Sequence, residues 1–237
     1  MNTITIPKLK KLFLYSAVLT SISLGFTACS DDEETTPTPT NTTAKVMVTH
    51  ASPDAPGVDL LVDNSKVNTA ALEFLGSTAY LGVNAGTRNI KVNAAGTTTT
   101  VINADVPFAA GKNYSLFAVD SLKKITAVLV EDDLTTPAAG KAHVRFIHLS
   151  PNAPAVDVAL AGGNVIWGDY TFKEGSTFTP LNAGTYNLEV RVAGTTSVVL
   201  PLPGITLTAG KIYTVYAKGF VGGNGAQALG AQIIVNN

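Results

Sequence analysis

The stretch HASPDAP, residues 50–56, decides the fold, because a near copy of it, HLSPNAP, stands at residues 148–154. The two histidines are 98 positions apart, 148 minus 50. The tetrapeptide Asn-Ala-Gly-Thr keeps the same spacing, at 84–87 and again at 182–185. A constant offset of this length indicates a tandem duplication, and it predicts two domains rather than a solenoid of short repeats.

Both copies have the residue alternation of β-strands. Residues 46–50 and 144–148 place apolar side chains at every second position, with His50 and His148 on the apolar face. Glycine and asparagine turns at intervals of about ten residues separate about seven short strands in each copy. We therefore expect an all-β protein made of two tandem sandwiches.

The first 28 residues are predicted to be a signal peptide, because lysines precede an apolar segment, 12–26, that is too short to span a bilayer. Cys29 follows Phe-Thr-Ala, which resembles the lipobox of bacterial lipoproteins. That resemblance implies cleavage before Cys29 and acyl chains that anchor the protein in a membrane. The alternative is an ordinary free thiol. With one cysteine in the chain, no intrachain disulfide is possible.

An acidic run follows the cysteine: Ser30, Asp31, Asp32, Glu33 and Glu34. It resembles the surface-export signal of lipoproteins in the Bacteroidetes, which implies a Gram-negative outer membrane and a protein that faces the cell exterior. The alternative is a solvated spacer on a lipoprotein that faces the periplasm. Residues 35–43, TTPTPTNTT, offer nothing to bury and predict a disordered or extended tether.

These features divide the chain into five parts. They are a signal peptide (1–28), a lipidated cysteine with its tether (29–43), a first sandwich domain (44–133), a linker (134–140) and a second sandwich domain (141–237). Each domain is long enough to bury a core of its own.

The composition excludes several classes of function. The net charge is −1 and only 14% of the residues are charged, so there is no basic surface for nucleic acid. The Gly-Lys pairs at 111–112 and 210–211 lack the rest of a phosphate-binding loop, and no nucleophile elbow is present. We expect no cofactor.

The H-x-S-P-x-A-P-x-V-D and N-A-G-T elements of both copies resemble a bacterial family catalogued as domain of unknown function 4397. The resemblance covers residues 44–235. It implies exported, often lipid-anchored proteins with an immunoglobulin-like or transthyretin-like sandwich. It implies no activity.

The histidine motifs are interpreted as structural corners. A buried neutral histidine must satisfy both ring nitrogens, and the serine, the carbonyls before proline and the aspartate of the next strand are its expected partners. The prolines fix a sharp exit from the strand. The corner residues are His50, Ser52, Pro53, Pro56 and Asp59, and in the second copy His148, Ser150, Pro151, Pro154 and Asp157.

A metal or acid–base site is the alternative for these motifs. A metal needs three or four ligands, whereas each motif offers one histidine and at most one aspartate. Both copies keep the motif, as expected when each sandwich needs it to fold. We therefore assign no catalytic and no metal-binding residue.

The second copy has aromatic residues that the first lacks. Trp167 and Tyr170 are predicted on a loop, where they would either stack on a sugar or close the end of the sandwich. The insertion Gly-Gly-Asn-Gly at 222–225, also confined to the second copy, is a second candidate binding edge.

The sequence thus predicts a non-catalytic cell-surface lipoprotein with an adhesive, structural or protein-binding role. The first alternative is an accessory glycan-binding lipoprotein that uses Trp167 and Tyr170. A hydrolase or metalloenzyme is the second alternative. The expected partners of the protein are a membrane, through the lipid on Cys29, and a surface glycan or protein.

Overall fold

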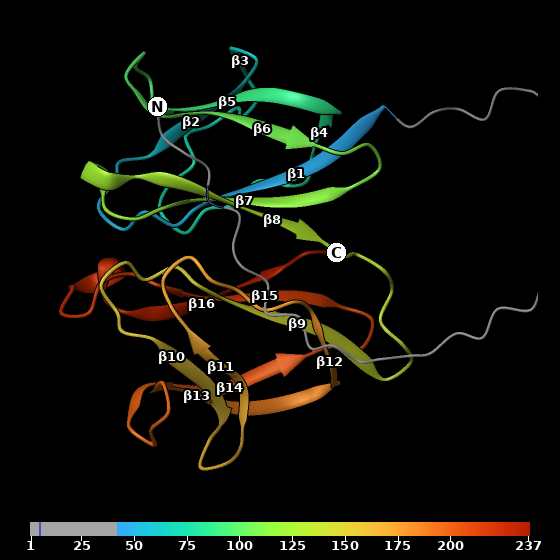
Figure 1. Cartoon of the computed structure of the whole chain (residues 1–237), viewed down its shortest axis with the longest axis vertical. Coiled ribbons are helices and arrows are strands. Elements are labelled where there is room, and N and C mark those ends of the chain that lie inside the picture. The colour runs from blue at the N-terminus through green and yellow to red at the C-terminus, as the bar shows by residue number, and fades with distance from the viewer. Residues whose placement is uncertain (1–4, 6–41) are drawn as a thin grey trace, which may run out of the picture.

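The computed structural model describes residue 5 and residues 42–237 (Figure 1). This part of the chain is all-β, as predicted, and forms two sandwich units. Two single 3₁₀ turns interrupt the strands, η1 (Leu122–Lys124) and η2 (Gly225–Gln227). None of the helical segments in the described residues has the length and apolar character needed to cross a membrane.

The first unit contains eight strands in two four-stranded sheets. Its inner sheet has the order β4-β1-β7-β8, and its outer sheet has the order β3-β2-β5-β6. β1 and β7 are parallel, and the other neighbours are antiparallel. The strands are β1 (Thr43–His50), β2 (Val58–Val62), β3 (Ser65–Lys66), β4 (Leu81–Asn84), β5 (Gly86–Ala94), β6 (Thr100–Phe108), β7 (Asn113–Val119) and β8 (Thr126–Asp132).

The second unit repeats this arrangement. Its inner sheet has the order β12-β9-β15-β16 with β9 and β15 parallel, and its outer sheet has the order β11-β10-β13-β14. The strands are β9 (Lys141–His148), β10 (Val156–Leu160), β11 (Val165–Tyr170), β12 (Thr179–Asn182), β13 (Gly184–Val192), β14 (Val198–Leu207), β15 (Ile212–Lys218) and β16 (Gly230–Val235).

Each unit has one strand more than the seven that the turn spacing predicts. The additional strands are β3, which is only two residues long, and its counterpart β11. Consecutive strands β1 and β2 lie in different sheets, whereas a constant-type immunoglobulin domain places its first two strands side by side in one sheet. Of the two sandwich types expected, the strand order therefore fits the transthyretin-like one.

The alternation of the strands fills a core between the two sheets of each unit. In the first unit this core includes Val46, Val48, Leu60, Val92 and Leu116, all almost fully buried. Corresponding positions of the second unit, among them Val144, Phe146, Val158 and Val215, form the second core. Each sandwich is thus stabilised by its own apolar interior.

The inner sheets of the two units face one another, so that four sheets are stacked in one body (Figure 1). A third apolar cluster fills the space between the inner sheets. Phe117 of β7 meets Tyr216 of β15 edge to face, with ring centroids 5.8 Å apart. The other members are fully or almost fully buried: Ala51, Val119, Val128, Val130, Ile147 and Leu149.

An ion pair lies at one end of this interface. Arg145 of β9 reaches across to Asp132 of β8 (Nη2 to Oδ1, 2.6 Å), and their side chains are 3% and 0% exposed. The guanidinium also lies over the Phe178 ring, 4.5 Å from its centroid. A buried charge pair is stable only when further hydrogen bonds satisfy its remaining polar atoms.

Hydroxyl and amide groups of both units complete the network. Tyr80 and Ser115 donate to Asp132 Oδ2 at 2.6 and 2.7 Å, and Asn236 Nδ2 donates to the Tyr80 hydroxyl at 3.0 Å. Arg145 Nε donates to the Thr214 hydroxyl at 2.9 Å. The two units are therefore joined by directional bonds as well as by apolar contact.

Tyr216 carries a hydroxyl that has no hydrogen-bond partner within the described residues, although the residue is fully buried. Phe117 occupies the corresponding position in the first unit. We expect Tyr216→Phe to raise the free energy of unfolding by about 1 kcal/mol, because the change removes an unpaired buried polar group and keeps the ring. Urea denaturation of the full chain measures this difference.

Tyr213→Phe is the matched control on the same strand. The Tyr213 hydroxyl accepts a hydrogen bond from the Thr208 backbone N–H at 3.1 Å. Its removal should lower the free energy of unfolding by about 1 kcal/mol. If Tyr216→Phe destabilises the chain as Tyr213→Phe does, the Tyr216 hydroxyl is paired in solution.

Candidate binding site

The histidine motif forms the same corner in both units. His50 and His148 are 0% exposed and end the strands β1 and β9. Nε2 of His50 lies 2.9 Å from the Pro56 carbonyl oxygen, and Nε2 of His148 lies 3.0 Å from that of Pro154. The sequence predicts that a carbonyl of a residue before a proline is the partner. In the structure, the accepting carbonyl belongs to the second proline of each motif.

These contacts fix the state of the two rings. A carbonyl oxygen only accepts, so Nε2 carries the proton in each ring and Nδ1 is left as an acceptor. Burial lowers the pKa of both histidines below its ordinary value, and the carbonyl hydrogen bonds oppose that shift only in part. The imidazoles are therefore neutral at pH 7, with the Nε2 proton committed to the backbone.

The residues after each histidine hold the loop that follows the seventh strand of the unit. Ser52 donates to the Asp120 carbonyl and Ser150 to the Gly219 carbonyl, both at 2.6 Å. Asn152 holds the loop of the second unit at a further point, since its side chain bonds both the N–H and the C=O of Val221, at 2.8 and 3.0 Å. The motif is thus a clip between the first corner and a distant loop.

The aspartates of the motif bond to the backbone of a turn and not to the histidines. Asp59 accepts from the Gly96 N–H at 3.0 Å and Asp157 from the Gly194 N–H at 2.9 Å, so each aspartate fixes the turn between the fifth and sixth strands of its unit. Lys66 lies 2.8 Å from Asp59, and its hydrogen bond is the main cause of the lowered pKa of that carboxyl group. Within residue 5 and residues 42–237, no three metal-binding side chains come together.

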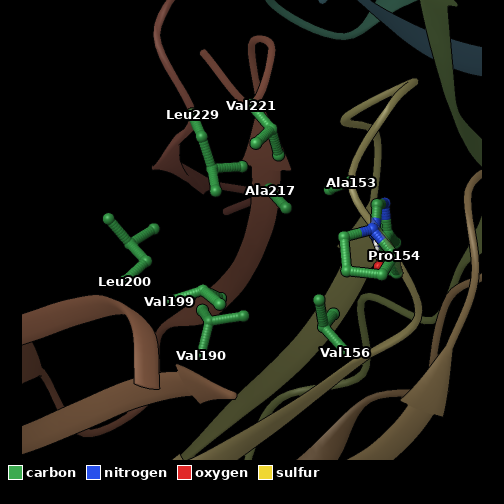
Figure 2. A pocket seen from close by; sticks show the side chains of 10 residues that line it. Ala153, Pro154, Val156, Val190, Val199, Leu200, Ala217, Val221 and Leu229 are labelled. Atoms are coloured by element: carbon green, nitrogen blue, oxygen red, sulfur yellow. Dashed lines mark hydrogen bonds between the residues drawn. The ribbon is translucent and has the colours of Figure 1, made fainter. Parts of the chain in front are cut away.

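A pocket opens beside the corner of the second unit (Figure 2). Its volume is about 370 Å³. One wall is the corner itself, with His148, Ala153 and Pro154, and Val156 and Ala217 also line the pocket. Val190, Val199 and Leu200 of the outer sheet line the second side, and Val221 and Leu229 line the third. The lining side chains are aliphatic apart from His148.

Two of these side chains mark the mouth of the pocket. Val199 is 38% exposed and Val221 is 48% exposed. They come from β14 and from the loop 219–229, and Figure 2 shows them on different sides of the hollow. Six of the seven large hydrophobic side chains exposed among the described residues belong to the second unit. Exposed apolar groups that adjoin a hollow are typical of a binding site.

The residues at the corresponding corner of the first unit are more buried. Ile125, which precedes β8 as Leu229 precedes β16, is 5% exposed and belongs to the first core. Val101 also packs against that core, whereas its counterpart Val199 is 38% exposed. The residues at this corner thus differ in burial between the two units.

The longer loop of the second unit explains the difference. Residues 219–229 connect β15 and β16, whereas residues 120–125 connect β7 and β8, which is eleven residues against six. Lys218 supports the longer loop, since its Nζ donates to the carbonyls of Ala226 and Ala228 at 2.7 and 2.9 Å. Gly219 has φ +77, and a Cβ there would overlap the Ala228 carbonyl, so glycine is needed for the loop to fold back on itself.

Trp167 and Tyr170 take no part in the pocket. They lie on strand β11 rather than on a loop, and they are 4% and 6% exposed. Trp167 Nε1 donates to the Thr179 hydroxyl at 3.1 Å, and Tyr170 packs edge to face on Phe146. Both rings close the core of the second sandwich. The alternative in which they bind a ligand is therefore corrected, because neither ring is accessible to a sugar.

Sequence reasoning missed most of the pocket, although one signal pointed to it. The insertion at 222–225 belongs to the loop that forms the third side. The N-terminal predictions cannot be placed on the structure. Cys29, the acidic run Ser30 to Glu34 and, apart from Thr5, the signal peptide lie outside the described residues.

Comparison with known protein families finds a match to part of the chain. Residues 44–159 match the family model described as domain of unknown function (DUF4397). The match covers β1 to β8, the linker and the start of the second unit as far as β10. No curated protein matches the chain.

Two solved structures show weak similarity. The TIE protein of Bacillus anthracis is 16% identical over 76% of this chain and 34% of its own, with a TM-score of 0.23. The carbohydrate-binding module CBMbc of family CBM26, from Amy13K of Eubacterium rectale, was solved in complex with maltoheptaose. It is 7% identical over 80% of this chain and 96% of its own, with a TM-score of 0.26. The chain spans about a third of the TIE protein. At these TM-scores, neither similarity supports an inference about a ligand.

Proposed function

We propose that this chain is a non-catalytic, lipid-anchored protein of the bacterial outer surface that binds an apolar ligand in the corner pocket of its second unit. The observation that carries the proposal is the pocket itself. Its volume of about 370 Å³ and its aliphatic lining are typical of small-ligand sites. At the corresponding corner of the first unit, Ile125 and Val101 pack against the core.

The chemistry of the pocket favours binding over catalysis. His148 is its one titratable lining residue, and its Nε2 proton is committed to the Pro154 carbonyl. Burial keeps the ring neutral by lowering its pKa. General acid–base catalysis needs a group that is free to exchange a proton with the substrate, and this ring is held in place by the fold.

The export signals and the stacked sheets support the rest of the proposal. The lipobox-like sequence at Cys29, the acidic run and the threonine-rich tether are arranged as in a lipoprotein displayed on the outer membrane. The second unit is proposed as a second copy of the family, because it shares the corner motif and the strand order of the first. The tether would then carry one stacked body whose ligand site is in the distal copy.

A neutral fluorescent probe tests the binding function. We expect N-phenyl-1-naphthylamine to bind the full chain saturably, with one site, and the emission to rise as the probe leaves water. Val199→Asp should weaken this binding at least tenfold, because the change places a charge on an apolar wall. Fluorescence titration measures both constants.

Val198→Asp is the matched control. Val198 is the neighbouring residue on β14, is 46% exposed and does not line the pocket. Its replacement should leave probe binding within twofold of the unmodified chain. If no saturable binding occurs, or if both variants weaken binding equally, the pocket is not a ligand site.

A further inference from the structure

The ligand class can be narrowed, on the premise that the pocket binds a ligand as proposed above. No aromatic side chain lines the pocket, so the wall offers no stacking surface. No lysine, arginine, aspartate or glutamate lines it either. The one heteroaromatic group, His148, is uncharged. The inserted part of the ligand is therefore apolar and without charge.

The first unit shows which groups suit such a corner. There the branched aliphatic chains of Ile125, Val101 and Ile102 pack on the same core. Val58 and Val92 belong to the same core, and they correspond to Val156 and Val190 in the second unit. A ligand alkyl group in the second unit would pack on these equivalent side chains.

The volume sets the length of the ligand. An apolar protein cavity of about 150 Å³ accommodates benzene, which has six carbon atoms. A pocket of about 370 Å³ accommodates two to three times as much, on the order of ten to fifteen carbons. A single leucine or isoleucine side chain would leave most of this space empty.

Backbone chemistry disfavours a peptide as the occupant. A peptide that lies in an apolar pocket must pair its N–H and C=O groups with polar groups of the wall. The N–H and C=O of Val221 at the mouth are already bonded to Asn152. In β14 the residues after Leu200 include Pro201 and Pro203, which have no N–H to donate. An alkyl chain has no such requirement.

We propose that the pocket binds an unbranched alkyl chain of about ten to fourteen carbons, which enters tail first between Val199 and Val221. The polar head of the amphiphile stays in solvent at the mouth. The clip of Asn152 and the support of Lys218 hold the third side open for it.

Displacement of N-phenyl-1-naphthylamine by n-alkanols tests this proposal. From hexanol to decanol, each added methylene should lower the dissociation constant about fourfold, since burial of a CH₂ contributes about 0.8 kcal/mol. The gain should level off between about C12 and C14, when the pocket is full. Val199→Asp should weaken decanol binding at least tenfold, and Val198→Asp should not.

The outcomes separate this inference from the function on which it depends. Saturable probe binding without displacement by any alkanol would overturn the alkyl ligand and leave the binding function standing. Displacement by leucine-rich peptides in place of alkanols would show that the ligand is a protein segment. An affinity that does not change with chain length would also overturn the proposal. Absence of probe binding would refute the binding function itself.

Discussion

Replacing Arg145 with alanine will lower the free energy of unfolding of the full chain by about 3–5 kcal/mol. The change leaves the carboxylate of Asp132, whose side chain is 0% exposed, buried without its cation. It also removes the donors to Ser115 and Thr214. The effect should be large because the lost charge pair lies inside a dry interface, where water cannot compensate the remaining anion.

Guanidinium denaturation, followed by circular dichroism, measures this loss. Lys112→Ala is the control, because Lys112 forms an ion pair with Glu131 in which both side chains are 54% exposed. That change should leave the midpoint unaltered, since exposed pairs are screened and contribute little. An equally small effect of Arg145→Ala would mean that the inner sheets do not enclose the pair in solution.

The chain itself supplies a compensating double variant. Met47 and Asn236 occupy the positions in the other unit that correspond to Arg145 and Asp132. We expect Arg145→Met combined with Asp132→Asn to recover most of the lost stability, because well-packed neutral groups often replace a buried pair without loss. If the double variant is less stable than Arg145→Ala, the charges themselves set the register of the two inner sheets.

The repeat made the fold predictable, but not the packing of the two units. Alternation at residues 46–50 and 144–148 places strands and turns correctly because side-chain direction has period two. The same alternation assigns Arg145 to the face opposite the core of its own sandwich, which normally means solvent. In the structure that face is covered by the first unit, and a sequence gives no direct signal for such burial.

The candidate site was predictable only where the two copies differ. Trp167 and Tyr170 differ between the copies, yet they fill the core, because large aromatic groups contribute most when buried. The insertion at 222–225 differs as well, and it belongs to the loop that lines the pocket. What could not be foreseen is that Ile125 is almost fully buried whereas Leu229 lines a pocket, since this depends on a loop path.

Mild acid will destabilise the chain through His50 and His148. Burial lowers the pKa of both rings below 6.5, and the carbonyls of Pro56 and Pro154 oppose this effect less strongly. The negative charges of Glu73 and Glu174 also raise the pKa of the rings, and their effect is smaller than that of the carbonyls. The unfolded chain therefore binds protons at a pH at which the folded chain does not.

The direction of the pH dependence follows from this difference. The stability that the neutral rings contribute is fully present above pH 6.5, and it is lost as the pH falls from 6.5 through the lower folded pKa. Within that window each histidine reduces the free energy of unfolding by about 1.4 kcal/mol per pH unit. Urea denaturation between pH 7.5 and about pH 5 measures the slope, above the range in which most carboxylates titrate.

The double variant His50→Gln with His148→Gln isolates the two rings. Glutamine keeps an N–H donor for each proline carbonyl and does not titrate. We expect this variant to be less stable than the unmodified chain at pH 7.5, because its side chains fill the corners less well. Its stability should nevertheless stay level down to about pH 5. An equal acid loss in both proteins would assign the titration to other groups, and no loss in the unmodified chain would show that the histidines accept protons in the folded state.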